Sequence, residues 1–233
     1  MGHFQGQLQA LLQRVTMMGL QTQAMIEKAV DGMVQRKPQL FAEVFAAEHQ
    51  VNAMQLEIDD LAVTLTALHQ PVARDARFLF MASRIAGELE RMADQAVNIC
   101  QNAHHMHDES ARVTRPPAAT TADLPVMAGA ALAMVRDSLT AMLEQDAALA
   151  DRVLAEDEKV DALRDRMFRS LLECIMADPS ITQWALSMIL IARNIERIGD
   201  HATNIGEEVI YWIQGRDVRH ARGIDNANQG QAQ

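Results

Sequence analysis

The chain has 233 residues, of which 49% are hydrophobic, so it can bury a substantial core in one large domain or two modest ones. Its formal net charge is −10 and no long basic run occurs, which argues against nonspecific binding of nucleic acid. Aromatic residues make up only 4% of the chain and proline is rare, a composition that suits an all-helical protein.

The N-terminal half predicts three helices. Apolar residues recur three and four positions apart over residues 5–35, 44–68 and 78–103, the spacing of a continuous helical seam. A Lys-Pro pair ends the first helix, and residues 69–71 form a short turn between the second and the third. Helices joined by turns this short pack antiparallel, so we assign residues 1–108 to a three-helix bundle.

The apolar period fails after the third helix, where histidine, serine, threonine and proline are frequent. We assign residues 109–124 to a linker. His104, His105 and His107 precede it in the same aperiodic stretch, and we expect them to be solvated there, with metal binding as the weaker alternative.

A second three-helix bundle is predicted over residues 125–215. Asp178 followed by Pro179 indicates the start of its last helix, because Asp caps a helix N-terminus and Pro fits the first turn. Residues 216–233, after Gly215, are polar and aperiodic, so we expect disorder. The predicted fold class is all-α, with two tandem three-helix bundles and six long antiparallel helices.

A motif recurs in the third and the sixth predicted helices. One constant offset aligns ELERMADQAVNICQN with the later segment NIERIGDHATNIGEE. The matching positions are Glu90, Arg91, Asp94, Ala96, Asn98 and Ile99 in the first copy, and Glu196, Arg197, Asp200, Ala202, Asn204 and Ile205 in the second. Self-similarity of this kind indicates an internal duplication.

The acids of the motif lie off the apolar seam. Glu196 and Asp200 are four residues apart on one helix face, where like charges repel by roughly a few tenths of a kcal/mol. The second and fifth helices also align and add a further acid-type pair to each bundle. The two predicted quartets are Glu48, Asn52, Glu90 and Asp94 in the first bundle, and Asp157, Asp161, Glu196 and Asp200 in the second.

Carboxylates that converge either raise their pKa values or hold a cation, and sites made only of oxygen favour ions such as Mg²⁺, Mn²⁺ and iron. The alternative is that Arg91 with Asp94, and Arg197 with Asp200, form ordinary surface ion pairs. Because the motif recurs in both halves, we favour metal binding. Asn52 is neutral, so we expect the first quartet to hold a cation less strongly than the second.

The remaining features indicate no other activity. His201 is interpreted as a surface histidine, with a metal ligand or a partner of a ligand as the alternatives. Cys100 and Cys174 lack metal or redox spacing and are expected to be reduced thiols in or near the core. The N-terminus lacks signal-peptide character, and charges interrupt the apolar window 181–195, so we expect a cytoplasmic protein without direct membrane insertion.

The segments LERMADQAVNI, IERIGDHATNI and HQPVARDARF, together with the two repeats, resemble the PhoU family over residues 5–215. The resemblance implies multinuclear metal clusters held on the bundle surface by E(D)xxxD pairs, most commonly iron, with Mn, Mg, Zn and Ni as alternatives. It carries over to both quartets, and Asn52 departs from the family's Asp.

The resemblance also implies an adaptor with no catalytic step. Such a protein represses the phosphate-starvation response when phosphate is plentiful, by contacting a PhoR-type sensor histidine kinase and the ATPase subunit of the phosphate ABC transporter, and it forms homodimers. The rival hypothesis is a carboxylate-bridged iron-binding bundle for storage or oxidoreduction. Bundles of that kind use Glu-x-x-His pairs that face the core, and this sequence contains no such pair.

Overall fold

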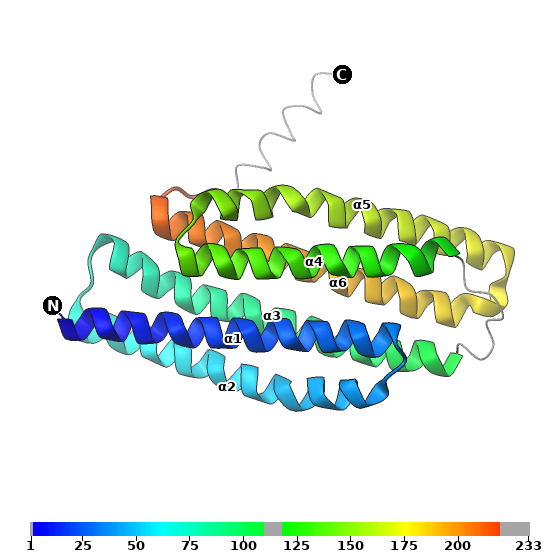
Figure 1. Ribbon diagram of the computed structural model, residues 1–233, viewed down its shortest axis with the longest axis horizontal. Coiled ribbons are helices and arrows are strands. Elements are labelled where there is room, and N and C mark those ends of the chain that lie inside the picture. Colours follow the sequence, from blue (N-terminus) through cyan, green and yellow to red (C-terminus); the bar gives the residue numbers. More distant parts are fainter. Residues whose placement is uncertain (1, 110–117, 220–233) are drawn as a thin grey trace, which may run out of the picture.

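The computed structural model describes residues 2–109 and 118–219, and within these ranges the chain forms six long α-helices and one short 3₁₀ turn (Figure 1). The elements are α1 (Gly2–Val34), α2 (Pro38–His69), α3 (Ala73–Glu109), α4 (Ala118–Glu144), α5 (Ala147–Ala177), η2 (Pro179–Ile181) and α6 (Thr182–Gln214). The predicted all-α fold with two three-helix bundles is confirmed.

Local sequence signals explain where the helices begin and end. Pro38 stands in the first turn of α2, where a missing N–H costs nothing. The Asp146 carboxylate caps α5 by accepting the backbone N–H groups of the second and third residues that follow it, at 2.9 and 3.0 Å. The predicted cap at Asp178 is also present, since its carboxylate accepts the Ser180 backbone N–H at 3.0 Å. It caps η2, which leads directly into α6.

The linker between the bundles is shorter than we predicted. α3 continues to Glu109, and α4 begins at Ala118 and contains Pro125, so much of the 109–124 range is helical and residues 110–117 lie outside the described chain. Burial explains the difference: Met106 at the end of α3 and Leu124 at the start of α4 both face the core. Tertiary contacts therefore override the loop preferences of these segments.

The histidines near this junction were also misplaced by the sequence prediction. His104, His105 and His107 all lie in α3 rather than in a linker. His107 is only partly exposed and its Nε2 lies 3.1 Å from the carbonyl oxygen of Met33, while its ring stacks on Phe41. His107 therefore ties the end of α3 to α1 and α2.

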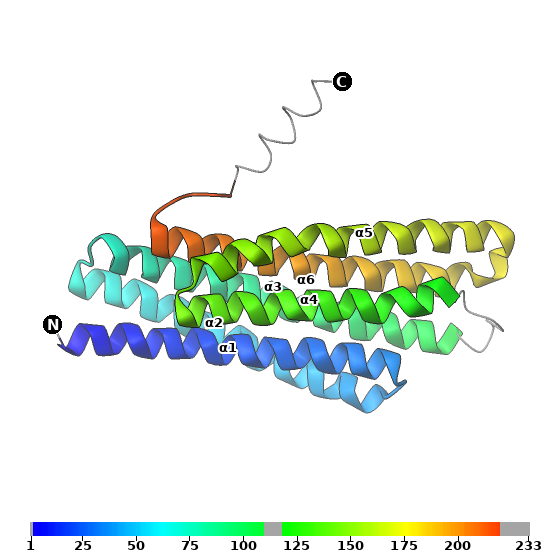
Figure 2. The same ribbon diagram turned by 45° about the horizontal axis from the view of Figure 1, so that its top comes forward.

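The helices form two layers. α3 and α6 pack against each other in the middle of one layer, with α2 beside α3 and α5 beside α6. α1 covers α2 and α3, α4 covers α5 and α6, and α1 also contacts α4 (Figures 1 and 2). The face formed by α2, α3, α6 and α5 is consequently left uncovered by other helices of the described chain.

α3 and α6 run antiparallel through one continuous core. Arg77 at the start of α3 donates to the carbonyl oxygen of Trp212 at the end of α6, at 3.2 Å, and Glu88 contacts His201 further along. Met92 of α3 and Ile198 of α6 are both fully buried in the same hydrophobic cluster. The two bundles thus share a single hydrophobic core across the α3 and α6 contact.

One segment within the described residues, Ala122–Glu144 of α4, is long and apolar enough to span a membrane by length and composition. Half of that segment is buried against the rest of the chain. Since α4 packs on α1, α5 and α6, its apolar character is accounted for by the core of the second bundle.

We predict that Ile198→Ala lowers the free energy of unfolding by about 2–5 kcal/mol, because it leaves a cavity where the two bundles meet. The matched control is Val63→Ala on α2, where the side chain is 69% exposed and the change should stay within about 0.5 kcal/mol. Denaturant unfolding of the metal-free protein measures both. Similar losses for the two variants would contradict a shared core centred on Ile198.

Candidate functional site

The first quartet lies along the contact between α2 and α3. Glu48 and Asn52 project from α2, and Glu90 and Asp94 project from α3. The Asn52 amide donates to Glu48 Oε1 at 2.5 Å, whereas Asn52 Oδ1 is buried without a hydrogen-bond partner in the described chain. Partial burial raises the pKa of Glu90, and the nearby charges of Asp94 and Glu48 raise it further.

The pKa of Asp94 is raised in the same way, first by burial and then by the charge of Glu48. The Glu48 carboxylate of α2 therefore raises the pKa of both acids of α3. Asn52 is linked to these acids through its hydrogen bond to Glu48.

The second quartet occupies the equivalent groove between α5 and α6. Burial raises the pKa of Glu196, with further increases from Asp161 and Asp157. Burial also raises the pKa of Asp200, and Glu196 and Asp161 add to the shift. The two helices are in contact here: a Cβ atom on Gly199 of α6 would lie at the ordinary van der Waals distance of 3.7 Å from Asp157 Oδ1. All four predicted members thus meet in one electrostatic cluster.

The donor chemistry of both quartets fits a hard cation. Each offers carboxylate or amide oxygens only, burial and then the repulsion of nearby carboxylates raise the pKa values of Glu90 and Asp200, and the first quartet adds the unpartnered oxygen of Asn52. Within the described ranges, however, no three His, Cys, Asp or Glu side chains are arranged to hold one ion in this conformation. Ion binding therefore requires the quartet side chains to rotate.

The simpler ion-pair interpretation fails for the first copy of the motif, because Arg91 pairs with Glu88 at 2.9 Å instead of with Asp94. The exposure of the quartets also disfavours a core-bound iron centre. None of the eight side chains is buried, and Asp94 and Asp200 are exposed. The quartets are surface features of the α2, α3, α6 and α5 face.

An arginine that the sequence analysis did not single out lies in the second quartet. Arg164 of α5 places Nη1 2.6 Å from Glu196 Oε1 and Nη2 3.7 Å from Asp161 Oδ1. It borders a groove of about 510 Å³ that is also lined by Arg193 and Arg197. The contact of Arg164 with Asp161 could have been predicted from the sequence, since Arg164 follows Asp161 by three residues on one helix face.

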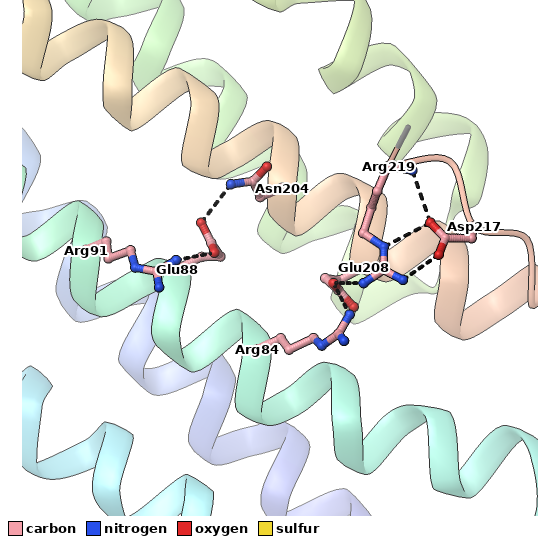
Figure 3. A network of polar contacts seen from close by, with 7 residues as sticks. All are labelled: Arg84, Glu88, Arg91, Asn204, Glu208, Asp217 and Arg219. Carbon is pink, nitrogen blue, oxygen red and sulfur yellow. Dashed lines mark hydrogen bonds and ion pairs between the residues drawn. The ribbon is translucent and has the colours of Figure 1, made fainter. Parts of the chain in front are cut away.

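A polar network joins the bundles between the two acidic grooves (Figure 3). The Glu88 carboxylate of α3, which is 13% exposed, accepts hydrogen bonds from Arg91 on its own helix and from Asn204 of α6 at 2.9 Å. His201 Nδ1 lies 2.7 Å from the same carboxylate. Burial raises the pKa of Glu88, but the bonds from His201 and Asn204 outweigh this effect and the net shift is downward.

The surface interpretation of His201 is therefore wrong. Its side chain is 11% exposed and lies in the contact between α3 and α6. The error arose because α6 buries two faces, one in its own bundle and one against α3, whereas the sequence seam reveals only the first. The prediction for the cysteines is confirmed: Cys100 is buried with its thiol pKa raised to about 12 by burial, and Cys174 is partly exposed and free.

The network continues to the end of α6. Glu208 is 9% exposed and its Oε1 accepts from Arg84 of α3 at 2.8 Å and from Arg219 at 3.4 Å (Figure 3). Arg219 also pairs with Asp217. The expected disorder of 216–233 thus does not describe residues 216–219, which pack on α6. Residues 220–233 lie outside the described chain.

We predict that Asp200→Asn leaves the stability of the metal-free protein unchanged or slightly higher at neutral pH. A raised pKa in the folded state means that the ionised carboxylate destabilises the fold, and this penalty disappears as the pH falls through the raised pKa. The stability of the wild type should therefore rise as the pH falls through the raised pKa of Asp200, and this rise should be smaller in Asp200→Asn. Unfolding curves at several pH values test this.

The matched variant for that experiment is Glu208→Ala, which leaves Arg84 and Arg219 without their shared acceptor and should cost about 1–3 kcal/mol. A comparable loss for Asp200→Asn would show that Asp200 belongs to a stabilising network.

Comparison with known proteins supports the duplicated architecture. The PhoU domain family matches the chain twice, over residues 15–103 and 124–209. The phosphate-specific transport system accessory protein PhoU of Escherichia coli K12 is 30% identical over 95% of this chain and 90% of its own length. A homologue from Zymomonas mobilis is 32% identical over 89% of this chain and 86% of its own length.

Solved structures agree with this assignment. The crystal structure of PhoU from Pseudomonas aeruginosa superposes with a TM-score of 0.86 at 30% identity, over 91% of this chain and all of that one. The phosphate transport system regulatory protein PhoU from Streptococcus pneumoniae has the same fold, with a TM-score of 0.83 at 22% identity over 92% of this chain and 99% of its own. With both repeats matched and relatives aligned over nearly their whole length, the chain belongs to the PhoU family.

Proposed function

We propose that this protein is a regulatory adaptor of phosphate transport that represses the phosphate-starvation response when phosphate is plentiful. The observation that carries the proposal is the family match across both repeats, with relatives named as accessory proteins of the phosphate-specific transport system. Its partners are a PhoR-type sensor histidine kinase and the ATPase subunit of the phosphate ABC transporter. The protein acts in the cytoplasm by binding, as a homodimer, with no turnover of its own.

Exposed apolar side chains support a role in protein contacts. A groove of about 520 Å³ between α2 and α3 is lined by Val63 and Phe80, which are 69% and 65% exposed. The equivalent positions of the second repeat are Leu172 and Leu186, 44% and 49% exposed. Large apolar side chains left exposed at matching places in both repeats are typical of surfaces that dock other proteins.

Metal binding at the two quartets is the second part of the proposal. Glu48, Glu90 and Asp94 with the Asn52 carbonyl oxygen would hold a cation in the first groove. Asp157, Asp161, Glu196 and Asp200 would do so in the second. We propose iron, with Mn, Mg, Zn or Ni as alternatives. The bound cation would neutralise the repulsion that raises the carboxyl pKa values and would change the charge of the face that meets the partners.

We expect deletion of the gene to leave phosphate-regulated genes active in phosphate-rich medium, because the repressing contact is lost. A chain that ends at Arg219 should restore repression, since it keeps the contacts of Arg219 with Glu208 and Asp217. A reporter under a phosphate-starvation promoter measures both. Normal repression in the deletion strain, with no second gene of this kind in the genome, would refute the regulatory proposal.

The apolar grooves can be tested separately. Phe80→Glu and Leu186→Glu should weaken repression, because each places a charge among the exposed apolar side chains proposed to dock a partner, while the thermal melting of the purified protein stays close to that of the wild type. The matched control is Val126→Glu, which is 60% exposed on α4, a helix that is not part of the face formed by α2, α3, α6 and α5. Loss of repression by all three variants, or by none, would count against the grooves.

A further inference from the structure

The second quartet already contains a cationic group. The Arg164 guanidinium lies against Glu196 at 2.6 Å and Asp161 at 3.7 Å, on the side where the two helices face each other. Glu196 is only 14% exposed, so this ion pair is partly shielded from solvent. The pKa of Arg164 is raised because the carboxylates around it outweigh its partial burial. The guanidinium thus lies in the region of negative potential where a metal ion would bind.

The first quartet has no arginine at the equivalent position; Glu48 Oε2 lies 3.3 Å from Nδ1 of the exposed His49, and Arg91 pairs with Glu88 outside the quartet. The alignment of α2 with α5 that pairs Asn52 with Asp161 places Gln55 opposite Arg164. Gln55 is neutral, and its repeat also has the neutral Asn52. Counting formal charges, the first quartet carries −3 from Glu48, Glu90 and Asp94, and the second carries −4 from its four carboxylates, or −3 once Arg164 is included. The extra carboxylate of the second quartet is therefore offset by an internal cation.

We propose that Arg164 is a built-in counter-cation of the second quartet, which an incoming metal ion must displace from Glu196. This inference rests on the proposed metal binding. It follows that the second groove binds a divalent cation more weakly than its four carboxylates alone would. Asn52 lowers the affinity for a cation in the first groove, and Arg164 lowers it in the second.

The surroundings of Arg164 allow it to leave. Its Nη2 also lies 2.9 Å from Asp165, which is outside the quartet, so the guanidinium keeps a carboxylate partner after it releases Glu196. The side chain is 32% exposed and borders the open groove of about 510 Å³. Displacement would leave the guanidinium paired with Asp165 in a groove that Arg193 and Arg197 of α6 also line. Metal binding would then change the charge that this groove presents to a partner.

The test isolates the second quartet in a parent chain that carries Glu90→Gln and Asp94→Asn. Purified metal-free protein is titrated with Mn²⁺, and free Mn²⁺ is counted by electron paramagnetic resonance. Adding Arg164→Gln should tighten Mn²⁺ binding on the order of tenfold, because a unit charge within a few ångströms of the ion is removed. Adding Arg164→Lys, which keeps the charge, should leave the affinity closer to that of the parent.

Two further variants serve as controls. Arg152→Gln removes the same charge from an exposed position about three turns earlier on α5 and should leave Mn²⁺ binding unchanged. In a chain that carries Glu196→Gln and Asp200→Asn, Gln55→Arg should weaken binding at the first quartet, since it supplies the missing cation. Circular dichroism melts confirm that each variant is folded.

The outcomes separate this inference from the proposal on which it rests. If the parent binds Mn²⁺ but Arg164→Gln leaves the affinity unchanged or lowers it, the counter-cation role is wrong and metal binding stands. An equal gain from Arg152→Gln would also overturn it, because the effect would then reflect net charge alone. If no chain with an intact quartet binds Mn²⁺, both the metal part of the proposed function and this inference fail.

Discussion

The antiparallel contact between α3 and α6 is the constraint on which the rest of the structure depends. Each of these helices packs on two helices of its own bundle and on the other, so both bury two faces. Fully buried residues such as Met92 and Ile198 join two small cores into one. Only one side of each helix remains for polar chemistry, and this side carries the acids. The acidic grooves are thus placed by the contact between the bundles.

The polar groups within that contact define its register. A buried carboxylate is costly unless it is well satisfied, and Glu88 receives hydrogen bonds from three side chains on two helices. Glu208 is similarly held by Arg84 and Arg219. Sliding α3 along α6 by one turn would separate Glu88 from His201 and Asn204, and Glu208 from Arg84. Apolar packing therefore drives the association, while the network specifies one alignment.

The duplication has left two similar grooves with different charge balances. Both place a carboxylate pair of the central helix against a pair from its neighbour, an arrangement that repulsion disfavours in the absence of a cation. In the first groove the repulsion is reduced by Asn52, and in the second by Arg164. Side chains that destabilise the fold at equivalent positions of both repeats are expected at sites that serve binding rather than folding.

Much of the fold was predictable because its causes are local. Apolar spacings of three and four residues specify helices, Asp178 and Pro179 specify a helix start, and the repeated motif specifies two bundles. The pairing of Glu90 with Asp94 on one face follows from helical geometry alone. The linker was predicted too long, since local loop preferences there are overridden by the burial of Met106 and Leu124.

The sequence by itself thus determined the helices, their grouping into two bundles and the faces on which the acids lie. Only the tertiary structure decided which side chains from distant helices meet: His201 with Glu88, Arg219 with Glu208, and Arg164 with Glu196. The physical reason is that helical periodicity records which face of a helix is buried in its own bundle. It carries no information about the register and orientation in which another helix or segment packs against that helix.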